Sequence, residues 1–279
     1  MLVSLQNLSA RHPAAKAGAS PAVRELSLDF QAGEQVAVIG PSGAGKTTFL
    51  HAIACALKPS GGQLILGTQA PWKLAARDLQ ALRGHLFLAP QVPPLPPRQR
   101  VVTSVLAGQL PQMSLAASLR SLFYPKDIPS AHQALQAFDL EGKIFDRVDR
   151  LSGGERQRVG LARLLASSAS LWLVDEPLSA LDPTRATQAL ESLTQHAKDR
   201  GATLICTLHQ VERALSNFPR IIGLRGGALA FDLPSAVVSQ EMLRQLYAQH
   251  EHELFGPAPD NGFPEQAASG AQAVVMHCR

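Results

Sequence analysis

The chain has 279 residues, of which 46% are hydrophobic, and this is enough apolar material for a buried core with a smaller subdomain attached. Its net charge of +4 is carried by dispersed Lys and Arg residues without a long basic run, which argues against nucleic acid as the partner. No stretch approaches the ~18 consecutive apolar residues of a membrane span, and the amino terminus lacks the basic start and apolar centre of an export signal, so we expect a protein of the cytosol. Three unclustered cysteines offer no disulfide framework or metal-ligand spacing.

The first part of the chain predicts strands on either side of a glycine-rich loop. Alternating apolar and polar residues predict half-buried strands at 2–8 and 22–30, which we expect to form an antiparallel flank. A buried strand at 35–39 then leads through the glycine-rich loop into a helix at 47–57, whose end is expected near Pro59.

The rest of the chain alternates strands and helices around one helical insertion. A proline cluster opens the region from about 91 to 169, where helical periods predict an all-helical subdomain. The other expected strands are 63–66, 86–88, 171–174, 203–207, 221–224 and 228–231, and the other expected helices are 74–82, 183–198 and 211–215. Alternation of this kind predicts an α/β fold, here with a mixed sheet core. The domain is expected over 1–255, and Gly- and Pro-rich residues 256–279 are expected to form a disordered tail.

The segment 40–47, with the sequence GPSGAGKT, has the composition of a phosphate-binding loop between a strand and a helix. Its glycines let successive backbone N–H groups turn toward one anion, and the N-terminus of the next helix adds its positive dipole end. Lys46 would reach the β- and γ-phosphates of a nucleotide, while the Thr47 hydroxyl would complete a Mg²⁺ shell. The alternative is a plain glycine-rich turn without a ligand.

Two neighbouring carboxylates follow the buried strand LWLV. Asp175 is placed to hold Mg²⁺ through water, and Glu176 is placed to polarise an attacking water. A surface acidic pair at the end of a core strand would look the same in isolation, but the phosphate loop upstream favours the metal and water roles.

A second helix N-terminus follows the segment LSGGE at 151–155. A Ser-Gly approach to a helix start can bind an anion, although a plain N-cap would look similar locally. One nucleotide cannot easily occupy both this site and the phosphate loop.

The phosphate loop, the LSGGE segment and the LWLVDE strand, in that order, resemble the ATP-binding cassette ATPases over nearly the whole chain. The resemblance implies a P-loop NTPase fold of the ABC type, ATP and Mg²⁺ as cofactors, and two copies of the chain that close head to tail over two ATP molecules. The implied nucleotide contacts on the loop are Gly40, Ser42, Gly43, Ala44, Gly45, Lys46, Thr47 and Thr48. The implied contacts from the second copy are Ser152, Gly153 and Gly154, which would meet the γ-phosphate.

The resemblance also implies roles for four further positions. Gln91 lies where the family has its lid glutamine, which links the magnesium site to the membrane partner, although its surroundings here are unusually proline-rich. His209 resembles the switch histidine that touches the γ-phosphate, against the alternative of a structural histidine. Asp182 ends the loop that crosses the dimer interface, and His12 stands where an aromatic ring stacks on adenine. The implied catalytic set is therefore Glu176, His209 and Gln91, and the metal set is Thr47, Gln91 and Asp175.

One phosphate loop, one LSGGE segment and no long coiled-coil insertion favour a transport subunit within the family. Such a subunit docks on integral membrane permeases at the cytoplasmic face of the inner membrane and acts indirectly with a periplasmic substrate-binding protein, with no nucleic acid as partner. Residues 105–108, 207–211 and 220–227 are similar to those of phosphonate importer ATPases, which implies uptake of phosphonates or related phosphorus oxyanions. The alternatives are a cassette for an amino acid, another oxyanion or lipoprotein release, and a cassette that acts on nucleic acid.

Overall fold

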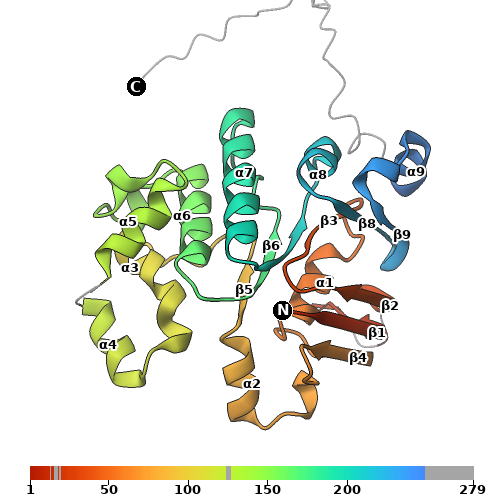
Figure 1. The fold of residues 1–279 in the computed structure, drawn as a ribbon, viewed down its shortest axis with the longest axis horizontal. Coiled ribbons are helices and arrows are strands. Elements are labelled where there is room, and N and C mark those ends of the chain that lie inside the picture. Colours follow the sequence, from red (N-terminus) through yellow and green to blue (C-terminus); the bar gives the residue numbers. More distant parts are fainter. Residues whose placement is uncertain (13, 16–17, 19, 124–126, 249–279) are drawn as a thin grey trace, which may run out of the picture.

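The computed structural model describes residues 1–12, 14, 15, 18, 20–123 and 127–248. The tail expected at 256–279 lies outside the described residues, as does the end of the domain expected over 1–255. Figure 1 shows two sheets side by side, with one group of helices set apart at the far end of the molecule.

The larger sheet has six strands in the order β5-β6-β7-β3-β8-β9, and its first five strands are parallel. Its strands are β3 (Gln35–Ile39), β5 (Leu86–Ala89), β6 (Leu171–Asp175), β7 (Thr203–Thr207), β8 (Arg220–Arg225) and β9 (Ala228–Pro234). Every residue of β6 and β7 is buried, as expected for parallel strands that are covered on both faces. Strand β9 pairs antiparallel with β8 through a tight glycine turn, so the predicted mixed α/β sheet is confirmed.

The smaller sheet is antiparallel, as predicted, in the order β2-β1-β4. Its strands are β1 (Val3–Ala10), β2 (Val23–Phe30) and β4 (Gly61–Leu66). Their buried side chains alternate with more exposed ones and pack, together with α1 (Lys46–Ile53), against one face of the larger sheet. Phe30 and Phe49 meet in this core with ring centroids 6.4 Å apart. The flank therefore holds the helix that follows the glycine-rich loop.

The other face of the larger sheet is covered by α7 (Pro183–Asp199) and α8 (Val211–Asn217), and α9 (Gln240–Leu246) lies beside β8. Helix α2 (Ala76–Arg83) leads into β5. The segment expected to be all helical holds α3 (Val101–Leu106), α4 (Leu115–Phe123), α5 (Ile128–Gln136) and α6 (Gly153–Leu165), which Figure 1 shows together at one end. Short 3₁₀ turns join the larger elements at 71–73, 107–112, 141–143, 148–150 and 235–237. None of the helices in the described part of the chain has both the length and the hydropathy that crossing a bilayer requires.

The predicted helix at 47–57 is too long, because α1 ends at Ile53. Cys55 adopts a left-handed conformation with φ of 55°, and the N–H groups of Ala56 and Leu57 both donate to the carbonyl of His51, at 3.0 and 3.1 Å. This arrangement caps the last turn in the way that a glycine usually does. The sequence has no glycine there, so the prediction ran on to Pro59. Helix α9 was also not predicted.

Candidate functional site

The glycine-rich loop is held tightly between the two sheets. Gly40 has φ of 151°, and a side chain there would overlap the carbonyl oxygen of Leu224 in β8. Gly45 has φ of 96°, and a side chain there would overlap the carbonyl oxygen of Ala22, just before β2. Backbone that comes this close from both sides leaves room for glycine alone. The loop therefore delivers α1 in one fixed direction.

Lys46 begins α1 and is almost fully buried, with 5% of its side chain exposed. Its ammonium donates to the carbonyl of Gly40 at 2.7 Å and to that of Pro41 at 3.3 Å. The lysine charge is thus aimed back into the loop, where an anion cradled by the loop would meet it.

The loop forms the floor of a cleft of about 550 Å³. Its lining brings together residues from six separate parts of the sequence: His12, Ala22, Ser42 to Thr48, Gln91, Glu176 and His209. Every predicted phosphate-loop contact except the buried Gly40 lines this cleft, together with the three residues predicted to act in catalysis. His12 accepts a hydrogen bond on Nδ1 from the N–H of Ala14, at 3.2 Å, which orients its ring at the cleft edge.

A short polar contact in the cleft joins Glu176 and His209, whose Oε1 and Nε2 atoms are 2.6 Å apart. Glu176 has a left-handed φ of 47°, which is rare for a residue with a side chain and is typical of functional sites. Its N–H donates to both the carbonyl and the hydroxyl of Thr207, at 3.2 and 3.0 Å. The strand end of β7 therefore fixes this unusual backbone, and the carboxylate is presented beside the histidine.

Asp175 ends β6 and is buried, with 4% exposed. One of its carboxylate oxygens accepts a hydrogen bond from the Thr207 hydroxyl at 2.6 Å. Among the described residues, no group of three or more His, Cys, Asp or Glu side chains could enclose a metal ion. A single aspartate with a nearby threonine hydroxyl suits Mg²⁺ that takes its other ligands from water and phosphate oxygens. The chemistry of Asp175 and of the Thr47 hydroxyl suits Mg²⁺ bound together with a nucleotide, but of the predicted metal ligands only Thr47 and Gln91 line the cleft, and Asp175 does not.

A second hollow of about 510 Å³ surrounds the start of α6. It is lined by Ser152, Gly153, Gly154, Glu155, Arg158, Ala180, Leu181, Asp182 and Arg185, and it shares no residue with the cleft above the phosphate loop. Ser152 and Glu155 form a reciprocal capping box, in which each side chain accepts from the other residue's N–H, at 3.2 and 2.7 Å. These hydrogen bonds keep the pKa of Glu155 below its usual value. Asp182 caps α7 by accepting from the N–H groups of Thr184 and Arg185.

Gln157, which was not among the predicted site residues, joins the two regions. It is 3% exposed, and its side-chain amide donates to the carbonyl of Glu176 at 3.0 Å. The same side chain accepts from the N–H of Ala180 at 2.9 Å and donates to the hydroxyl of Ser179 at 3.2 Å. The only available signal was a polar residue on the buried face of a helix. Gln157 ties α6 to the backbone that carries Glu176.

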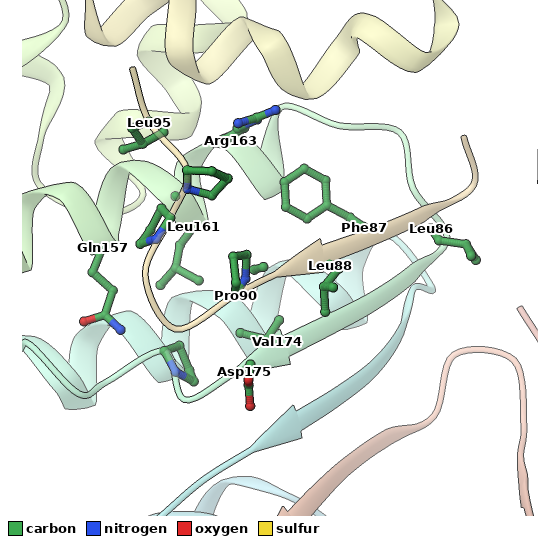
Figure 2. A pocket seen from close by; sticks show the side chains of 15 residues that line it. Leu86, Phe87, Leu88, Pro90, Leu95, Gln157, Leu161, Arg163, Val174 and Asp175 are labelled. Carbon is green, nitrogen blue, oxygen red and sulfur yellow. The ribbon is translucent and has the colours of Figure 1, made fainter. Parts of the chain in front are cut away.

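Figure 2 shows a third hollow, a groove between α6 and the chain that runs from β5 through the proline cluster. We call it the proline groove; its walls are Leu86 to Pro90, Pro93 to Leu95, Gln157, Gly160, Leu161, Arg163, Val174, Asp175 and Pro177. A side chain at Gly160 would come within 2.5 Å of Pro93, so the glycine lets the proline segment lie on α6. Gln91 of the same segment lines the cleft, so one short stretch of chain borders both sites.

Arg163 supplies positive charge to a mostly apolar groove. Figure 2 shows its side chain at one edge, between Leu95 and Phe87. Its Nε is buried and has no hydrogen-bond partner within the part of the chain that the structure describes. Burial lowers the pKa of the guanidinium, because removal from water disfavours its charged form.

The comparisons with known proteins agree with this geometry. A family model described as ABC transporter matches residues 23–179. The chain is 65% identical over the full length of both chains to phosphonates import ATP-binding protein PhnC 2 of Albidiferax ferrireducens. It is 66% identical, again over both full lengths, to phosphonates import ATP-binding protein PhnC of a Polaromonas species. Among solved structures, the chain is similar to the dimeric ATP-binding cassette MJ0796 in a post-hydrolysis state bound to ADP and Pi. The TM-score is 0.70 and the sequence identity is 26%, and the match covers 84% of this chain and 98% of MJ0796.

From the hydrogen bonds of Gln157, we predict that their removal destabilises the fold. In Gln157→Leu, the carbonyl of Glu176 keeps its bond from the N–H of Ser179 but loses the one from Gln157, and the N–H of Ala180 loses the Gln157 acceptor. We expect the free energy of unfolding, measured with urea, to fall by about 1–3 kcal/mol. Gln195→Leu is the matched control, because Gln195 is exposed and bonds only Asp199; it should change the same quantity by less than about 0.5 kcal/mol. Equal stability of the two variants would contradict the role given to Gln157.

Proposed function

Because the chain belongs to the ABC transporter family, we propose that it hydrolyses ATP as the motor subunit of an importer for phosphonates or related phosphorus oxyanions. The observation that carries the ATPase role is the single cleft in which the phosphate loop, Glu176 and His209 meet. The full-length identity to the phosphonates import ATP-binding proteins supports the substrate class.

The phosphate loop binds the triphosphate of ATP through its backbone N–H groups and Lys46, and His12 stacks on adenine at the cleft edge. Thr47, Gln91 and Asp175 would hold Mg²⁺: Thr47 and Gln91 line the cleft, and Asp175 ends β6 one residue before Glu176. Bound there, the ion would neutralise charge on the phosphate oxygens. Lys46 donates to the carbonyls of Gly40 and Pro41, and phosphate oxygens bound on the loop would compete with these carbonyls for its ammonium.

Glu176 orients the attacking water and accepts its proton, because its carboxylate stands at the cleft wall on a fixed backbone. His209 holds that carboxylate in place at 2.6 Å and faces the γ-phosphate.

A second copy of the chain completes the site. The hollow at Ser152, Gly153 and Gly154 has no residue in common with the cleft, so one nucleotide does not fill both on the same molecule. In a head-to-tail homodimer, the start of α6 in one copy covers the γ-phosphate held by the other, and the loop that ends at Asp182 lies at the interface. The dimeric form of the similar ATP-binding cassette supports this arrangement.

The membrane partner docks on the proline groove at the cytoplasmic face of the inner membrane, and a periplasmic binding protein delivers the substrate to that partner. The groove offers apolar walls and the unpartnered Nε of Arg163, so it suits a permease segment with apolar residues and one carboxylate. Gln91 connects this groove to the cleft, which gives ATP binding a route to the permease.

Glu176→Gln tests the proposed function both in solution and in cells. The amide cannot accept the water proton, so we expect ATP to bind normally while turnover falls about a hundred- to ten-thousandfold. The variant should accumulate an ATP-bound dimer, detectable by gel filtration with ATP and Mg²⁺. In a strain that lacks the native chain, it should not restore growth on methylphosphonate as the sole phosphorus source.

Glu191→Gln is the control, since Glu191 is exposed on α7, and it should behave as the native chain in each assay. Normal ATP turnover by Glu176→Gln would refute the catalytic role. Unimpaired growth on methylphosphonate without any copy of the chain would refute the substrate class and leave the ATPase role standing.

Charge reversal in the proline groove tests the docking surface. Arg163→Glu should repel the permease carboxylate, so we expect substrate-stimulated ATPase in vesicles with the permease to fall about tenfold or more. ATP binding by the isolated subunit should be unchanged, because Arg163 does not line the cleft. Lys198→Glu on the exposed side of α7 is the control for net charge. Equal stimulation of the Arg163→Glu and native proteins would exclude the groove as the docking site.

A further inference from the structure

Helix α9 lies outside the region matched by the family model, yet it reaches the phosphate loop. It starts at the cap of Ser239, whose hydroxyl accepts from the N–H of Met242, and it ends at Tyr247. The Tyr247 side chain is fully buried within the core on the α7 and α8 side of the large sheet. Its hydroxyl accepts a hydrogen bond from the N–H of Gly40 at 3.2 Å.

Both backbone polar groups of Gly40, its N–H and its carbonyl, are therefore hydrogen-bonded to side chains. Its N–H donates to Tyr247, its carbonyl accepts from Lys46 at 2.7 Å, and Leu224 fills the space where a side chain would stand. Gly40 is buried, so its N–H cannot turn to water if the tyrosine hydroxyl is removed. The hydroxyl thus fixes the peptide to which the phosphate-binding lysine is itself bound.

The turn that carries Tyr247 is also fastened to β8. The guanidinium of Arg225 donates to the carbonyl of Gln245 at 2.6 Å and to that of Ala248 at 3.4 Å, one residue on either side of the Leu246–Tyr247 pair. Arg225 directly follows Leu224, the residue that packs against Gly40. The loop and the end of α9 are thus attached to the same strand.

We propose that Tyr247 is a positioning residue for ATP binding, which holds the first residue of the phosphate loop in the conformation that the triphosphate requires. This inference deepens the proposed ATPase function and rests on it. Tyr247 does not line the cleft; it acts through Gly40 and Lys46. The residue that ends α9 thus holds the loop through one hydrogen bond. Loss of this hydrogen bond weakens ATP binding without changing the chemical step.

Tyr247→Phe removes the hydroxyl and keeps the buried ring. We expect ATP, titrated calorimetrically with Mg²⁺ in a Glu176→Gln background, to bind about tenfold more weakly, which corresponds to about 1.4 kcal/mol. Hydrogen exchange at the Gly40 amide should become faster. With the native Glu176, KM for ATP should rise while kcat stays within about twofold, since uniform binding is lost.

Thr203→Val is the matched control, because it removes another fully buried hydroxyl, at the start of β7, whereas the phosphate loop follows the other end of the neighbouring parallel strand β3. It should lower the melting temperature without changing ATP affinity. Unchanged ATP affinity in Tyr247→Phe would overturn the proposal, as would an equal loss of affinity in Thr203→Val, which would point to general instability.

Arg225→Gln gives a second test if Tyr247→Phe does not fold. Arg225 is exposed, and its loss frees only the carbonyls at the end of α9. We expect ATP to bind about threefold more weakly and hydrogen exchange at the Gly40 amide to become faster. Native affinity for ATP would contradict the positioning role of Tyr247. A native chain that does not bind ATP at all would instead refute the proposed ATPase function.

Discussion

The close approach of the phosphate loop to both sheets is the constraint on which the rest of the site depends. Besides the contacts at Gly40 and Gly45, the N–H of Gly227 donates to the carbonyl of Ala44, at 3.1 Å, and the N–H of Arg24 donates to the carbonyl of Gly227, at 2.7 Å. The loop is thus joined to the antiparallel flank and to the β8–β9 turn at once. Because backbone meets backbone here, no rearrangement of side chains can relax the loop. The direction of α1, and with it the position of Lys46, follows from this packing.

Local patterns in the sequence were sufficient for most of the fold and for the cleft. The strands of the large sheet are continuous apolar runs, and the phosphate loop has its own composition, so both could be predicted without a partner element in view. Three features could not. Cys55 ends α1 in a conformation that its residue type does not suggest, Gln157 owes its role to a loop some twenty residues away, and Tyr247 meets Gly40 across more than two hundred residues. In each, a contact between distant parts of the chain decides the outcome.

The starts of α1 and α6 differ in how they are built. The loop before α1 is fixed by backbone that packs against Gly40 and Gly45, whereas the start of α6 is closed on itself by the capping box of Ser152 and Glu155. The start of α6 is nevertheless coupled to the cleft, because Gln157 on the same helix supports the backbone of Glu176. A displacement of α6 would therefore act on the backbone of Glu176 through the Gln157 side chain.

The proline segment between Gln91 and Leu95 has a thermodynamic consequence for assembly. Proline rings restrict the backbone before any partner arrives, and Pro93 is already seated on α6 at Gly160. A flexible segment would lose conformational entropy when a complex forms, and that loss would reduce the affinity. The prolines of this segment lower its conformational entropy before binding. Restricted in this way, the segment would favour complex formation through the smaller conformational entropy that it loses.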